Sequence, residues 1–151
     1  MGAVANLAPE LFRAIVAEVG FVDPLTTMLD PSLPLTVVEW EEWGDPLHDE
    51  EAYGWLAGYS PYENMGSGRY PAVLATAGLN DPRVGYHEPT KWVARLRDRA
   101  DGADASSLDE RPVLLKVELG SGHGGPSGRY DAWRDEAFVL AFTLASIAPG
   151  A

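Results

Sequence analysis

The sequence contains no cysteine among its 151 residues. Disulfide bonds, thiolate nucleophiles and thiolate zinc sites are therefore excluded, and stability has to come from packing. Basic residues are also scarce, because 11 Lys and Arg stand against 23 Asp and Glu and give a formal net charge of −12. A surface of this sign repels nucleic acid and anionic membranes but admits cationic ligands. We therefore expect neither a nucleic-acid nor a membrane partner.

Targeting segments are missing as well. The first twenty residues have no basic start followed by an apolar run, so they predict no signal peptide. No stretch approaches the ~20 apolar residues that a membrane-spanning helix needs. With 46% hydrophobic and 23% charged residues, the composition is that of one soluble globular domain, which we expect in the cytoplasm by default.

Short apolar runs alternate with helical patterns along the chain. Runs bounded by Gly or Pro predict three buried strands, over residues 14–19, 71–78 and 111–119. Helices are predicted over residues 1–11, 89–100 and 130–147. The last of these aligns one apolar stripe, which comprises Tyr130, Trp133, Ala137, Leu140, Ala141 and Leu144. This alternation predicts an α/β fold, in which a parallel sheet carries helices on its faces.

Two segments fall outside this pattern. Residues 23–51 are acidic and punctuated by proline, which predicts a loop with short helical turns. Long irregular segments in a compact domain are more often functional than accidental. Residues 101–110 are polar and predict a surface insertion.

Two polar residues each follow a predicted strand. Asp81 comes directly after the second strand, and His123 lies among glycines after the third. Catalytic groups of open parallel sheets sit in loops at the carboxyl ends of strands. An Asp followed by a His in such loops is the second half of the order Ser, Asp, His found in α/β hydrolases. The alternative is structural, since Asn-Asp-Pro is an ordinary turn and a His among glycines is commonly a solvated loop residue.

A nucleophilic serine is absent from this pattern. The sequence has no Gly-x-Ser-x-Gly, and neither Gly66-Ser67-Gly68 nor Pro126-Ser127-Gly128 lies between a strand and a helix. Ser127 also follows His123, which is the wrong chain order for this fold.

Longer strings of sequence resemble the prolyl oligopeptidase family of serine peptidases, and within it oligopeptidase B. The matching strings are FVDPLTTMLDPSLPLT, EWEEWGDP, GYSPYEN, YPAVLATAGLNDPRVGYHEPTKWVARLR and SGHGGPSGRYDAWRDEAFVLAF. The resemblance extends from near Met1 to the last predicted helix and spares only residues 101–110. It implies that residues 1–151 are the C-terminal half of an α/β-hydrolase catalytic domain.

The resemblance also implies roles for particular residues. Asp81 and His123 would be the acid and base of the triad, and the serine would lie about six residues upstream of Met1, which would then be an internal methionine. Glu39 and Glu41 would bind the basic side chain before the scissile bond. A buried cation needs such a carboxylate partner. On the residues alone, Glu39 and Glu41 read as a solvated acidic loop.

These implications define the expected partners and the alternatives. The expected partners are basic peptide substrates and the upstream half of the same catalytic domain. No cofactor or metal is expected, because His48 and His87 lack the spacing of metal ligands. The implied activity is hydrolysis of peptides after Arg or Lys through an acyl-enzyme. The alternatives are an inactive truncated product that binds peptide or a partner chain, and another α/β hydrolase such as an esterase or dipeptidyl peptidase.

Overall fold

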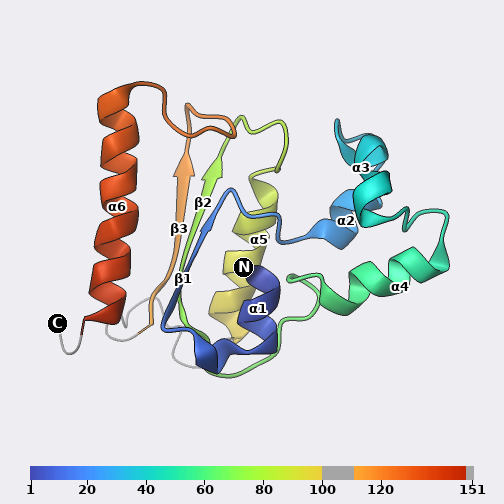
Figure 1. Cartoon of the computed structure of the whole chain (residues 1–151), viewed down its shortest axis with the longest axis horizontal. Coiled ribbons are helices and arrows are strands. Elements are labelled where there is room, and N and C mark those ends of the chain that lie inside the picture. The colour runs from blue at the N-terminus through green and yellow to red at the C-terminus, as the bar shows by residue number, and fades with distance from the viewer. Residues whose placement is uncertain (100–110, 149–151) are drawn as a thin grey trace.

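A three-stranded parallel sheet forms the centre of the molecule, as the computed structural model of residues 1–99 and 111–148 shows (Figure 1). The strands are β1 (Ala14–Glu18), β2 (Ala72–Gly78) and β3 (Val113–Glu118), in the order β1-β2-β3. In register, Val73 lies opposite both Ile15 and Val113. The predicted α/β class with a parallel sheet is confirmed, whereas the predicted insertion over 101–110 lies outside the described residues.

Helices cover both faces of the sheet. On one face lie α1 (Gly2–Leu7) and α5 (His87–Arg99), and on the other lies α6 (Arg129–Ile147) (Figure 1). Alternate strand residues face opposite sides, so Val73 packs with Trp92 and Leu96 while Leu74 packs with Phe142. The predicted single helix over 1–11 is wrong, because α1 ends at Leu7 and a 3-10 helix, η1 (Pro9–Leu11), follows. Proline disfavours helical geometry in the residue before it.

The apolar stripe predicted for the last helix lies on the side of α6 that is turned away from the sheet. Tyr130, Trp133, Leu140 and Leu144 are each more than half exposed. The sheet is instead contacted by Val139 and Phe142. Sequence periodicity could not choose between the two sides, because α6 is apolar on both.

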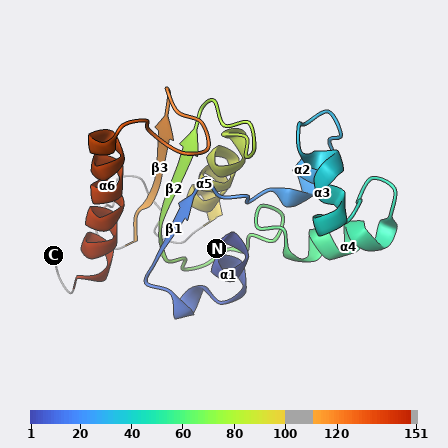
Figure 2. The same cartoon turned by 45° about the horizontal axis from the view of Figure 1, so that its top comes forward.

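A helical lobe is inserted between β1 and β2. It consists of α2 (Pro24–Met28), α3 (Thr36–Trp43) and α4 (Glu50–Tyr59), and it stands beside the α5 side of the sheet (Figures 1 and 2). Leu25, Met28 and Leu56 form its core. The short helices α2 and α3 agree with the turns predicted over residues 23–51, whereas α4 was not predicted. Within residues 1–99 and 111–148, no helix is long and apolar enough to cross a membrane.

We expect the purified chain to self-associate. Its α6 stripe is exposed, and no described strand pairs with the outer side of β1, so apolar surface and unpaired backbone groups are both available. Light scattering after size exclusion should show species larger than 16.3 kDa. Replacing Trp133 and Leu144 by Lys should shift the distribution toward the monomer, whereas a monodisperse wild-type monomer would contradict this expectation.

Candidate active site

The loops after β2 and β3 bring Asp81 and His123 together. The Nδ1 of His123 lies 2.8 Å from Oδ2 of Asp81. The Asp81 side chain is 1% exposed and that of His123 is 36% exposed. One edge of the imidazole is therefore held by a buried carboxylate, while the ring remains open to a ligand. This geometry agrees with the predicted proximity of the two residues.

The second oxygen of Asp81 is held by its own loop. Its Oδ1 accepts hydrogen bonds from the backbone N–H groups of Arg83, at 2.8 Å, and Val84, at 3.1 Å. Burial by itself raises the pKa of the carboxyl, but these N–H groups and His123 outweigh burial and leave the pKa below its ordinary value. Asp81 is thus fixed as an oriented carboxylate.

A close backbone contact sets the distance between the two loops. The N–H of Asn80 donates to the Ser121 carbonyl at 3.0 Å, and the Asn80 side chain donates to the Leu119 carbonyl at 3.2 Å. A Cβ atom on Gly78 would lie 2.5 Å from the carbonyl oxygen of Gly122 and 2.8 Å from that of Ser121. The His123 loop can therefore approach the Asp81 loop only because residue 78 has no side chain.

We expect Gly78→Ala to separate Asp81 from His123. The added methyl group meets backbone atoms, so the loops have to move apart, at about 1–3 kcal/mol of folding free energy. Urea unfolding should give the loss, and the NMR signal of the Nδ1 proton of His123 should shift or broaden. Gly120→Ala is the matched control, because nothing lies within 4 Å of its added Cβ. Equal stability and an unchanged His123 signal in both variants would refute the contact.

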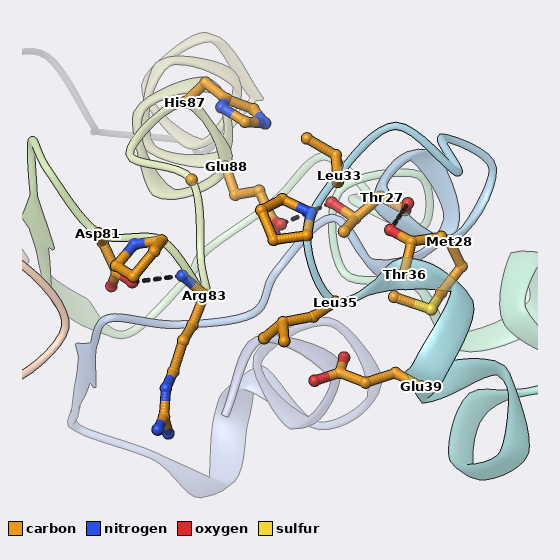
Figure 3. Close-up of a pocket in the computed structure, with 13 residues that line it drawn as sticks. Thr27, Met28, Leu33, Leu35, Thr36, Glu39, Asp81, Arg83, His87 and Glu88 are labelled. Carbon is orange, nitrogen blue, oxygen red and sulfur yellow. Dashed lines mark hydrogen bonds between the residues drawn. The ribbon is translucent and has the colours of Figure 1, made fainter.

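A cavity of about 440 Å³ opens beside His123. Glu39, Glu42 and Arg83 line it together with His123, and its remaining walls are mainly apolar. A smaller cavity of about 180 Å³, whose lining residues are drawn in Figure 3, shares Glu39 and Arg83 with it. Helix α3 therefore places carboxylates in the space next to the imidazole.

The structure separates the two glutamates singled out in the sequence. Glu39 is half-buried and lines both cavities, whereas Glu41 and Glu42 are both exposed and Glu41 lines neither cavity. On a helix, residues two apart point to different sides while residues three apart share one. The residue that joins Glu39 in the cavity is accordingly Glu42. The i, i+3 spacing of Glu39 and Glu42 becomes visible only once EWEEWG is helical, and the sequence predicts a loop with short helical turns there.

The surroundings of His123 and of the other histidines can be described in the same way. Among residues 1–99 and 111–148, no serine hydroxyl is hydrogen-bonded to His123. The same residues contain no group of three His, Cys, Asp or Glu side chains that could hold a metal ion. His48 pairs with Asp45 at 2.8 Å on the exposed surface of the lobe, away from His123.

Comparison with known proteins identifies the family. The model of the prolyl oligopeptidase family matches residues 1–149. The chain belongs to this family of serine peptidases. It is 50% identical over 144 residues to Protease 2 of Moraxella lacunata, a match that covers 95% of this chain and 20% of that protein. It is 45% identical over 144 residues to dipeptidyl aminopeptidase BI of Pseudoxanthomonas mexicana, covering 95% of this chain and 19% of that protein.

A solved structure agrees with this assignment. Oligopeptidase B from Leishmania major superposes with a TM-score of 0.89 at 42% identity, over 97% of this chain and 19% of that one. The fold is therefore that of part of an α/β-hydrolase domain, and the predicted resemblance to oligopeptidase B is confirmed. The chain spans about a fifth of the length of the relatives that it matches.

Proposed function

We propose that this chain supplies the acid, the base and the basic side-chain pocket of a serine peptidase that cleaves after Arg or Lys. The observation that carries the proposal is the 2.8 Å contact of Asp81 with His123 beside a cavity lined by Glu39 and Glu42. Residues 1–151 would then be one partial catalytic domain. Its partners would be basic peptides and the upstream half of that domain.

The Asp81–His123 pair fits the proton transfers of acyl-enzyme hydrolysis. A carboxylate on Nδ1 keeps the proton on that nitrogen, so Nε2 is left as an acceptor. His123 would take the proton of the serine hydroxyl during attack and return it to the leaving amine. Asp81 would stabilise the imidazolium that exists between these two steps.

The cavity fits a cationic side chain. The carboxylates of Glu39 and Glu42 have no ion-pair or hydrogen-bond partner in the described part of the chain. Two unpaired carboxylates face one guanidinium, that of Arg83, so the lining favours a cation. Arg and Lys side chains pair well with carboxylates in such partly enclosed sites, and Arg can do so with two parallel hydrogen bonds.

We expect the 151-residue chain alone to hydrolyse no Arg or Lys amide, because its sequence places no serine in a nucleophile elbow. A hybrid peptidase, in which this chain replaces the matching 20% of the Moraxella lacunata Protease 2, should hydrolyse both. Fluorogenic peptidyl-Arg amides measure the two activities. The first expectation would be contradicted if the chain alone hydrolysed the amide and this activity was blocked by a fluorophosphonate and abolished by His123→Ala. A folded but inactive hybrid would contradict the second expectation.

The similarity to a dipeptidyl aminopeptidase favours a second candidate function. An acidic cavity can also take the free amino terminus of a peptide. Substrates with free and blocked amino termini separate the two functions, because an endopeptidase or oligopeptidase accepts both and a dipeptidyl aminopeptidase needs the free amine.

A further inference from the structure

Glu88 is a buried carboxylate outside the Asp81–His123 pair. It is the second residue of α5 and is 1% exposed. Its Oε2 accepts hydrogen bonds from the backbone N–H groups of Val22, at 3.1 Å, and Asp23, at 2.9 Å, and its Oε1 accepts one from the Thr27 hydroxyl at 2.6 Å. All three donors belong to the segment where the chain leaves the sheet and enters the lobe.

The environment of Glu88 opposes its negative charge. Burial is the largest effect and raises the pKa of its carboxyl, and the charge of Asp23 raises it further, although the three hydrogen bonds lower it. Burying a carboxylate costs desolvation free energy, whereas an apolar side chain would pack there without this penalty. Packing alone therefore does not account for a glutamate at this position. What distinguishes the Glu88 carboxylate is that it accepts three hydrogen bonds from the segment that joins β1 to the lobe.

The contacts continue from this segment to the pocket. The Thr27 carbonyl accepts a hydrogen bond from the buried Thr36 hydroxyl at 2.9 Å, and the Met28 carbonyl accepts one from the Trp40 indole at 3.0 Å. Both donors belong to α3, which also carries Glu39. Figure 3 shows Glu88 reaching from α5 toward Thr27, with Thr36 and Glu39 beyond it.

The other end of this connection is the loop of Asp81. The N–H of Glu88 donates to the Gly85 carbonyl at 3.0 Å, so α5 begins directly on the loop that orients Asp81. Lys91, one turn later, pairs with Asp23 at 2.5 Å and adds a second link between α5 and the lobe. The start of α5 is therefore one of the links that set the position of α3 relative to Asp81 and His123.

We propose that Glu88 is a positioning residue for the basic side-chain pocket. Its hydrogen bonds hold α2, and through α2 they hold α3 with Glu39 and Glu42 at a fixed distance from His123. The proposal rests on the proposed function and assigns Glu88 no contact with the reacting atoms. Loss of its carboxylate should weaken recognition of the basic side chain more than the chemical step.

The first test measures amide hydrogen exchange in the 151-residue chain. Glu88→Ala should speed exchange of the α3 amides about tenfold or more, because two buried N–H groups lose their acceptor and the lobe opens locally. Glu88→Gln should stay within about threefold of the wild type, since its amide oxygen still accepts both N–H groups. Phe142→Ala is the control, because it weakens the opposite face of the sheet and should leave local opening of α3 unchanged. Unchanged α3 exchange in Glu88→Ala would overturn the proposal.

The second test measures kinetics in the hybrid peptidase. Glu88→Ala should raise KM for a peptidyl-Arg amide about tenfold with a smaller change in kcat, and Glu88→Gln should restore KM. Thr27→Val, which removes only the hydroxyl donor to Glu88, should give an intermediate KM and provides the measurement if Glu88→Ala does not fold. A wild-type hybrid that cleaves no basic substrate refutes the proposed function. If the hybrid is active but KM is unchanged in Thr27→Val and Glu88→Ala, the role of Glu88 is refuted.

Discussion

The hybrid peptidase carrying Asp81→Asn should lose about four orders of magnitude in kcat for peptidyl-Arg amides. The backbone N–H groups of Arg83 and Val84 occupy Oδ1 of Asp81, so they should select the oxygen of the new amide. Its NH2 group then faces Nδ1 of His123, which has to become the acceptor. The proton moves to Nε2, and this nitrogen can no longer accept the proton of a serine hydroxyl.

The size of this loss separates a catalytic acid from a turn residue. Asp81→Asn preserves the volume of the side chain, and its folding should be checked by the thermal transition of the hybrid. The NMR tautomer signature of His123 should change from a proton on Nδ1 to a proton on Nε2. A folded variant that retains a tenth or more of wild-type kcat would show that Asp81 serves only its loop.

The double variant Glu39→Gln/Glu42→Gln should lose tens to a few thousand fold in kcat/KM on Arg and Lys substrates. Truncating one partner of a charge pair that substrate binding desolvates costs about 2–5 kcal/mol, and each 1.4 kcal/mol corresponds to about one decade. Cleavage after neutral residues makes no use of the carboxylates and should change little. The ratio of kcat/KM for Arg and neutral substrates measures the effect.

Two controls test whether contact causes this loss. Steering by the formal charge of −12 also attracts basic substrates, but it weakens with salt, so a loss that persists at high salt identifies contact. Glu41→Gln removes the same charge from the same helix but from a residue outside both cavities. Near-normal kcat/KM in the double variant, or an equal loss in Glu41→Gln, would contradict the assignment of the pocket to Glu39 and Glu42.

The sheet and the polar residues at its carboxyl edge follow directly from the sequence. Buried parallel strands are short, apolar and bounded by breakers, so their positions were predicted to within two residues at each end. Parallel strands end at one edge of a sheet, which is why the sequence alone predicts Asp81 and His123 at the same edge. Their catalytic role stays a prediction.

Other features depend on tertiary contacts that no local pattern contains. The side of α6 that meets the sheet could not be predicted, because apolar residues occupy both of its sides. Gly78 has the appearance of an ordinary strand end, and only the crossing Gly122 carbonyl shows why a side chain is excluded there. Glu88 precedes the helix predicted over 89–100, and the role proposed for it depends on donors 61 to 66 residues away along the chain.

The most direct measurement of the central claim is the hydrolysis of a peptidyl-Arg amide by the hybrid peptidase, with and without His123→Ala. If Asp81 and His123 are the acid and base of the triad, the hybrid should turn over this substrate in preference to a neutral one. His123→Ala should then reduce kcat by several orders of magnitude without unfolding the protein. A folded hybrid that is inactive, or that retains its activity after His123→Ala, would contradict the claim.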